Sequence, residues 1–258
     1  MAMMPQTAYD RATIIFSPEG DLYQVRYAFE AVRKGWTSIG IKGVDAVVLA
    51  AEKRKLTKLL DLESIEKIYK VDDHIGVAFA GMGSDGRILI DQARLIAVRH
   101  RLLYGEPPTV DYVAKAISDI KQLYTQHGGV RPFGVSLIFG GINPDGKIRL
   151  IKTDPGGQFF NYYAVAIGSG ESFVNGFLEQ NYRKDMGFDE IIDLVLEAIF
   201  KSKIEGGGEK MEKEELIEEL PRLVEIGYVK SDDRIFKKMT PEEIREHVDK
   251  LRDKLLNK

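Results

Sequence analysis

Residues 81–86 carry the pattern that comes nearest to a cofactor-binding motif. The pattern is G-x-G-x-x-G, placed after an expected strand and before an expected helix whose N-terminus would bind a pyrophosphate. A dinucleotide-binding fold also needs a second parallel strand after that helix, with an acidic residue about 20 positions further on. Another helical pattern follows here instead, and Glu106 at that distance lies in a Gly/Pro loop. We therefore expect a tight strand-to-helix turn and no cofactor.

Metal and serine-hydrolase chemistry find little support among the other reactive residues. The chain has no cysteine, and its histidines are widely spaced: His74, His100, His127 and His247. No pair of them has the spacing of metal ligands on a helix. No G-x-S-x-G motif occurs, and residues 168–170 are interpreted as a turn into a helix. We expect no metal site.

The composition is that of an ordinary globular chain. The 258 residues are 44% hydrophobic and 30% charged, with 37 Lys and Arg against 40 Asp and Glu. The formal net charge of −3 provides no overall basic field for nucleic acid or anionic lipid. The longest uncharged stretch, 155–170, is too polar to span a membrane, and the N-terminus lacks the pattern of a signal peptide. We expect a cytoplasmic protein with no nucleic-acid or membrane partner.

Hydrophobic periodicity predicts the elements that position the candidate residues. A turn at 17–20 leads into a helix over 20–35, which Gly35 ends as a C-terminal cap. Residues 38–80 are expected to form one meander of four strands. Residues 204–222 are expected to be a flexible charged insertion leading into a solvated helix. The four strands of the meander are 38–41, 46–51, 65–70 and 75–80.

The remaining elements also arrive in blocks. Helices are expected at 84–103 and 109–126, then strands at 135–139, 148–153, 159–163 and 164–167, then helices at 171–182 and 189–203. A strand pair at 223–230 and 235–239 and a helix opened by the capping box 240–243 complete the chain. This order favours an α+β fold in which two five-stranded antiparallel sheets face each other between helix layers, as one domain over 1–258.

Several segments of the chain closely resemble proteasome α subunits of the archaeal type. The N-terminal segments carry the signature of that family, and the resemblance covers nearly the whole chain, most weakly at 205–223. It implies a four-layer αββα sandwich, the fold of the N-terminal-nucleophile hydrolases. The segments are 9–12, 16–20, 22–25, 27–28, 30–32, 64–68, 127–137, 153–155 and 166–170.

The family fold implies a protease, so the nucleophile position needs examination. In catalytic β subunits a strand begins with a threonine whose freed amine acts as base. The matching position here is Trp36, and the resemblance implies that the preceding residues are retained, so Thr37 has no free amine. Glu52 matches an acidic residue of the β site, but the nearest equivalent of the catalytic lysine is Glu63. We expect a non-catalytic subunit in which Glu52 is a structural remnant.

The resemblance implies a gating role instead. Seven α subunits form each outer ring of an α7β7β7α7 particle, and their N-terminal segments, here 1–12, cover the pore through which unfolded polypeptide enters. Tyr9, Asp10, Pro18 and Tyr27 match the cluster that holds the open gate in the family. A capped turn stacked on a helix is the alternative interpretation of the same four residues, and both can hold together.

The resemblance also implies a docking pocket for an ATPase activator of the AAA class. Lys67 matches the lysine that receives the activator's C-terminal carboxylate, and Gly81 and Met82 match the pocket wall. Arg26 is a further candidate for the pocket. It stands where the family usually has Glu, and Phe29 stands where it often has Arg, so we hypothesise a diverged α paralogue whose gate or activator preference differs.

Residues 127–130, which we call the pore loop, match the loop that lines the narrow pore of the family. They are His127, Gly128, Gly129 and Val130. Two other classes of function stay open at this point. One is a self-standing N-terminal-nucleophile amidohydrolase that uses Thr37 or Ser38 after internal cleavage, and the other is a nucleotide-binding protein based on the 81–86 motif.

Overall fold

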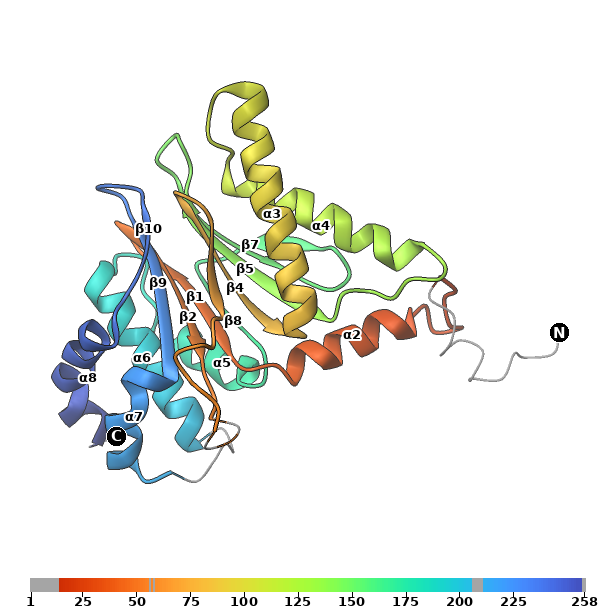
Figure 1. The fold of residues 1–258 in the computed structure, drawn as a ribbon. Coiled ribbons are helices and arrows are strands. Elements are labelled where there is room, and N and C mark those ends of the chain that lie inside the picture. Colours follow the sequence, from red (N-terminus) through yellow and green to blue (C-terminus); the bar gives the residue numbers. More distant parts are fainter. Residues whose placement is uncertain (1–13, 56, 58, 206–210, 257–258) are drawn as a thin grey trace.

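Two antiparallel sheets pack face to face at the centre of the molecule (Figure 1). The computed structural model describes residues 14–55, 57, 59–205 and 211–256. The first sheet has the spatial order β10 (Phe236–Lys238), β9 (Val224–Lys230), β2 (Ala46–Glu52), β1 (Ser38–Lys42) and β8 (Ala164–Ile167). The second has the order β3 (Ile68–Asp72), β4 (Ile75–Gly81), β5 (Val135–Ile142), β6 (Ile148–Thr153) and β7 (Phe159–Asn161). The expected pair of five-stranded sheets is therefore confirmed.

Helices cover the outer face of each sheet (Figure 1). The second sheet packs against α3 (Gly83–Tyr104) and α4 (Val110–Gln126). The first packs against α5 (Glu171–Asn181), α6 (Phe188–Glu205), α7 (Lys213–Leu223) and α8 (Pro241–Leu256). The remaining helix, α2 (Tyr23–Arg33), lies across one end of the sandwich and contacts β4 and β5. Among the described residues, no helix has the length and apolar character needed to cross a membrane.

Three apolar layers hold these four layers of structure together. One lies between the two sheets, and one lies between each sheet and its helices. Strand β2 contributes side chains to two of these apolar layers, because successive side chains of a strand point to opposite faces. Val48 and Ala50 face the helices, whereas Val47 and Leu49 face the other sheet. A strand buried on both faces is continuously apolar, as the sequence of β2 is.

The predicted four-stranded meander is wrong. β1 pairs with β2 in one sheet, and β3 pairs with β4 in the other. The free edge of β2 is occupied by β9, from Ala46 opposite Lys230 to Glu52 opposite Val224. A period of two predicts a strand but carries no information about which strand pairs with it, so consecutive strands were assigned to one sheet in error.

The predicted flexible insertion at 204–222 is also wrong for its described part. Residues 204–205 end α6, and α7 is a packed helix whose Leu216, Ile217 and Leu220 are buried in the core with α6 and α8. Apolar residues at helical spacing form one face of α7 and its many glutamates form the other, so the charge content concealed an amphipathic helix. Residues 206–210 lie outside the described part of the chain.

The predicted helix boundaries hold best where side-chain caps are present. At the start of α8, the backbone N–H of Thr240 donates to Glu243 Oε2 at 2.7 Å and the N–H of Glu243 donates to Thr240 Oγ1 at 3.2 Å, which confirms the capping box. Gly35 follows directly after the C-cap of α2, next to the place where the sequence predicts the helix to end. Lys34 caps α2 with φ of −84°, and Gly35 is not among the positive-φ glycines.

Candidate functional site

Lys67 is buried at one end of the sandwich, directly before β3. Only 4% of its surface is exposed, although most lysines reach solvent. Its Nζ donates to the carbonyl oxygen of Trp36 at 2.8 Å and lies 5.7 Å and 5.1 Å from the ring centroids of Trp36 and Phe79. The ammonium therefore lies between two aromatic rings and one carbonyl.

The carboxylates nearest to Lys67 are already paired with other cations. Glu52 accepts from Arg54 Nε at 2.9 Å and from Lys203 Nζ at 2.7 Å. Glu225 accepts from Lys238 Nζ at 2.7 Å and from the backbone N–H of Lys67 at 2.8 Å. Glu52 is thus paired with Arg54 and Lys203, and Glu225 with Lys238, whereas Lys67 Nζ forms no ion pair with either carboxylate.

Burial and charge both act on the ionisation of these groups. Burial lowers the pKa of Lys67 to about 7, with Arg54 lowering it further and Glu52 and Glu225 only partly opposing the shift. Burial alone would raise the pKa of Glu52, but Arg54 and Lys203 outweigh it and hold that pKa below its usual value. Glu52 is therefore an anion tied into an ion-pair network.

Our assignment of Glu63 to the position of the catalytic lysine is wrong. Glu63 lies in an exposed turn, where its backbone N–H donates to Asp61 Oδ1 at 3.0 Å. Lys67 is the residue that lies near Glu52 and the start of β1. The irregular segment between β2 and β3 carries no periodicity, and for that reason counting residues along it misplaced the equivalence.

Gly35, Gly81 and Gly134 meet where α2, β4 and β5 converge. A Cβ on Gly35 would overlap the backbone of Gly81, and a Cβ on Gly81 would overlap the carbonyl of Gly134. Gly81 also has φ of +114°, which strongly favours glycine. Gly35 is therefore needed for close backbone approach, and this contact brings Gly81 next to Trp36, the partner of Lys67.

Met82 completes this end of the sandwich. Its backbone N–H donates to the carbonyl of Gly134 at 2.9 Å, and its side chain is 41% exposed at the start of α3. Lys67 is connected to Gly81 through Trp36 and Gly35, and the docking pocket of Lys67, Gly81 and Met82 that the family resemblance implies stays a prediction. Arg26 is not drawn toward them: it pairs with Asp21 Oδ2 at 2.8 Å and lies over the ring of Tyr23, with 60% of its side chain exposed.

Of the four gate candidates, Pro18 and Tyr27 are described, and Tyr9 and Asp10 lie outside the described residues. Pro18 belongs to a turn in which the N–H of Gly20 donates to the carbonyl of Ser17 at 2.9 Å. The ring of Tyr27 stacks on Tyr23 at 6.4 Å. The capped turn and the stacking on the helix are both present.

The pore loop is held at both ends and has little around its middle. His127 Nδ1–H donates to the carbonyl of Leu123 in α4 at 2.8 Å. A Cβ added to Gly128 or Gly129 would meet no atom within 4 Å, and Gly129 has φ of +86°. Val130 is exposed, and Arg131 begins the next anchored segment.

Asp85 anchors that segment, although no pattern in the sequence singles it out. Its Oδ2 accepts from Arg131 Nη1 at 2.7 Å and its Oδ1 from Arg131 Nη2 at 2.8 Å. Oδ2 also accepts from the backbone N–H of Gly134 at 2.8 Å. Burial opposes ionisation of this carboxyl, but the Arg131 and Gly134 hydrogen bonds hold the pKa of Asp85 below its usual value. Asp85 is the fifth residue of the 81–86 motif, so the motif positions a loop.

The structure does not favour either alternative function, the self-standing amidohydrolase or the nucleotide-binding protein. Thr37 is buried and its Oγ1 accepts from the N–H of Gly170 at 3.1 Å, while Ser38 Oγ donates to the carbonyl of Phe79 at 2.7 Å. Both hydroxyls are thus engaged inside the fold. After the 81–86 motif, α3 leads to α4 rather than to the parallel strand that a dinucleotide fold requires.

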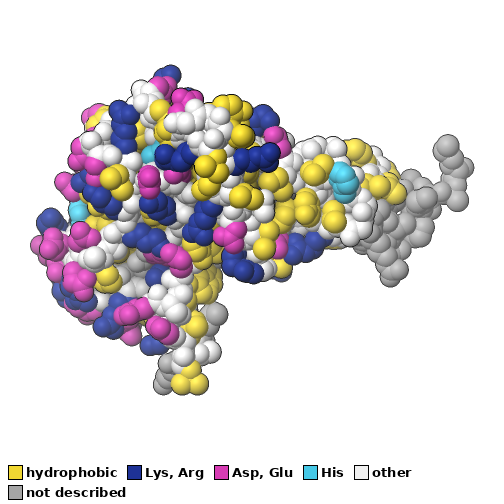
Figure 2. All heavy atoms as spheres, turned by 45° about the horizontal axis from the view of Figure 1, so that its top comes forward, with side chains coloured by type: hydrophobic (Ala, Val, Ile, Leu, Met, Phe, Trp, Pro, Cys, Tyr) yellow, Lys and Arg dark blue, Asp and Glu magenta, His cyan; other side chains and the backbone are white. Residues whose placement is uncertain are grey.

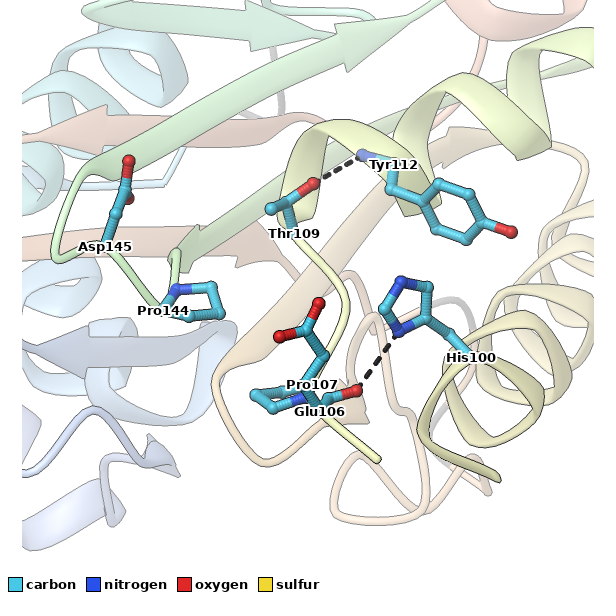
Figure 3. A pocket seen from close by; sticks show the side chains of 7 residues that line it. All are labelled: His100, Glu106, Pro107, Thr109, Tyr112, Pro144 and Asp145. Atoms are coloured by element: carbon cyan, nitrogen blue, oxygen red, sulfur yellow. Dashed lines mark hydrogen bonds between the residues drawn. The ribbon is translucent and has the colours of Figure 1, made fainter. Parts of the chain in front are cut away.

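A shallow cleft of about 320 Å³ lies elsewhere, between the α3–α4 connection and the β5–β6 hairpin (Figure 3). His100 Nδ1–H donates to the carbonyl of Glu106 at 3.1 Å, and Thr109 Oγ1 accepts from the N–H of Tyr112 at 3.1 Å. These contacts fix the walls of the cleft but assemble no reactive group. Within the described ranges, no cluster of His, Asp and Glu has the arrangement of a metal site.

Comparison with known proteins agrees with the resemblance seen in the sequence. The family model of proteasome subunits matches residues 32–217, and the model of the N-terminal signature of A-type proteasome subunits matches residues 9–31. The chain is 60% identical to the proteasome α subunit of Aeropyrum pernix over 97% of this chain and 96% of that protein. It is 53% identical to the protein of the same name from Sulfolobus acidocaldarius, over 94% of this chain and 97% of that protein. The chain belongs to the proteasome α subunit family.

Proposed function

We propose that this α subunit is itself non-catalytic and forms the seven-membered outer ring of an α7β7β7α7 core particle. The ring admits unfolded polypeptide to threonine protease sites on the β subunits, in the cytoplasm. The observation that carries the non-catalytic assignment is the state of Thr37, which is buried, peptide-linked to Trp36 and engaged by the N–H of Gly170. An N-terminal nucleophile needs a free amine and an accessible hydroxyl, and Thr37 has neither in this fold.

Assembly is supported by an exposed apolar face on α3. One side of the helix is buried against the second sheet, but the other exposes Ile88, Leu95 and Leu102, each seven residues apart. Val98 adjoins them. Contiguous exposed apolar surface of this kind marks protein interfaces. Charged side chains are frequent on the left of the view in Figure 2, and hydrophobic ones are more frequent on its right.

Docking of an ATPase activator is supported by the charge balance around Lys67. Glu52 is paired with Arg54 and Lys203, and Glu225 with Lys238, so a carboxylate from a partner would supply the ion-pair partner that neither of them gives Lys67 Nζ. The rings of Trp36 and Phe79 lie 5.7 Å and 5.1 Å from Lys67 Nζ, so a docking carboxylate would meet the ammonium beside two aromatic rings. The pore loop and the gate segment 1–12 would then control passage.

Native mass spectrometry of the chain alone and with its β subunit, with peptidase activity recorded for both samples, tests this proposal. We expect rings of seven or fourteen subunits that are inactive alone and active only with β. The mass of each subunit should include the residues before Thr37. A catalytically active chain shortened by about 4 kDa would support a self-standing amidohydrolase instead, because that enzyme requires cleavage before Thr37 or Ser38.

A further inference from the structure

An ion pair of high geometric quality links Arg131, the residue after the pore loop, to Asp85 of α3. Arg131 and Asp85 form two parallel hydrogen bonds of 2.7 and 2.8 Å, and the Asp85 side chain is 9% exposed. Bidentate Arg–carboxylate pairs fix relative orientation as well as distance. Asp85 also accepts a hydrogen bond from the backbone N–H of Gly134, the residue before β5. The same carboxylate therefore also holds the start of that strand.

The opposite end of the loop is held by α4. His127 bonds to the carbonyl of Leu123 there. On the Arg131 side, the ring of Phe133 also packs on Tyr124 of α4, at 4.6 Å between centroids. Between the anchors at His127 and Arg131, only three residues span the gap, and two of them are glycines with open space where a side chain would lie. The conformation of this short span therefore depends on where its two anchors lie.

We infer that the Asp85–Arg131 ion pair positions the pore loop and thereby limits the size of polypeptide that passes it. This rests on the proposed function, in which the loop faces the entering chain. Asp85 and Arg131 are positioning residues, since they act through residues 128–130. Loss of the bidentate geometry frees one anchor of the loop, and the three-residue span then samples positions further from the pore axis.

Arg131→Lys is the sharpest variant, because lysine retains the charge but cannot form the two parallel bonds. A matched control exists at the other end of the same helix. Arg101 there forms a bidentate pair with Asp72, with hydrogen bonds of 2.9 to 3.1 Å, and the Asp72 side chain is 11% exposed. Arg101→Lys removes a pair of the same type and burial but leaves the pore loop untouched.

The experiment uses the core particle assembled with β subunits, and compares the hydrolysis of unfolded casein with that of a short fluorogenic peptide. Arg131→Lys should raise the casein-to-peptide ratio about threefold, the factor by which removing a restraint of about one RT changes a rate. Arg101→Lys should leave the ratio unchanged. Amide hydrogen exchange at Gly134, whose N–H donates to Asp85 Oδ2, should accelerate in the first variant only.

Two further variants keep the outcomes distinct. Asp85→Asn retains an acceptor for the N–H of Gly134 and should raise the ratio even if Arg131→Lys assembles poorly. Val130→Trp places a large side chain at the exposed loop position and should lower the casein-to-peptide ratio. If Val130→Trp changes the ratio but the Arg131 and Asp85 variants match Arg101→Lys, the positioning role is overturned. If Val130→Trp also has no effect, the proposed location of the loop in the pore fails.

Discussion

At the scale of single residues, Lys67 combines burial with a missing counter-ion. Its Nζ has a carbonyl and two rings around it, while Glu52 and Glu225 are bonded to other cations. An ammonium in such surroundings is destabilised until an anion arrives. We therefore expect substitution of Lys67 to change activator docking and, separately, the pH dependence of stability.

Lys67→Ala should abolish the activator-stimulated part of peptide hydrolysis by the assembled particle, because the docking carboxylate loses its charge partner. Lys70→Ala is the matched control: Lys70 lies three residues along in β3, is exposed and pairs with Asp73. Stimulation titrated against activator concentration distinguishes the two. Equal stimulation of both variants would contradict docking at Lys67.

Stability should rise with pH in a way that depends on Lys67. The pKa of Lys67 is lowered from 10.5 to about 7 in the folded chain, so between these values the unfolded chain binds more protons than the folded one. The free energy of unfolding then increases with pH, by up to about 1.4 kcal/mol per unit. Lys67→Met should remove this contribution to the slope in denaturant titrations from pH 7 to pH 9. Lys121, buried with a pKa also lowered to about 7, contributes equally to both proteins and cancels in the difference.

At the scale of elements, the glycine contact between α2 and β4 determines how closely the end of the sandwich can pack. Gly35→Ala should destabilise the chain by about 2 kcal/mol or more, because its Cβ would overlap the backbone of Gly81. Gly176, inside α5, has open space where a Cβ would be. Gly176→Ala should instead stabilise by about 0.5–1 kcal/mol through helix propensity. Thermal unfolding of the two variants should give shifts of opposite sign.

Two substitutions in helix α7 test whether this helix is packed in the core or is solvated. Leu220 is fully buried among α6, α7 and α8, so Leu220→Ala should cost about 2–5 kcal/mol. Glu219→Ala, at the neighbouring and partly exposed position, should change the free energy of unfolding by less than about 0.5 kcal/mol. Similar small effects at both positions would mean that α7 is solvated, as the charge pattern alone predicts.

Most helices and strands could be predicted from the sequence, but which strands pair with each other could not. The capping box at 240–243 has local chemistry, and it is present in the structure. Strand pairing of β2 with β9 depends on residues some 180 positions apart, which no local pattern encodes. Lys67 and Gly81 were selected by family resemblance, whereas Asp85 and Gly35 owe their roles to contacts that only the fold creates.

At the scale of the whole molecule, the exposed apolar face of α3 is the surface that we expect another subunit to cover. Leu102 is 81% exposed, so Leu102→Asp removes no packing from the isolated chain. We expect this variant to unfold at an unchanged temperature but to form less of the complete particle with β subunits, because a charge replaces apolar contact area. Leu59→Asp is the control, since Leu59 is also exposed but lies outside α3. Native mass spectra in which both variants assemble equally would rule out α3 as an assembly surface.

The same helix is tied down at both ends. Near its start Asp85 is bound to Arg131, and near its end Arg101 is bound to Asp72, each through two parallel hydrogen bonds to residues outside the helix. Between these two ion pairs, the inner face of α3 is supported along its length by the second sheet. A partner that binds the exposed face would therefore meet a rigid surface, and the helix would move only together with the sheet.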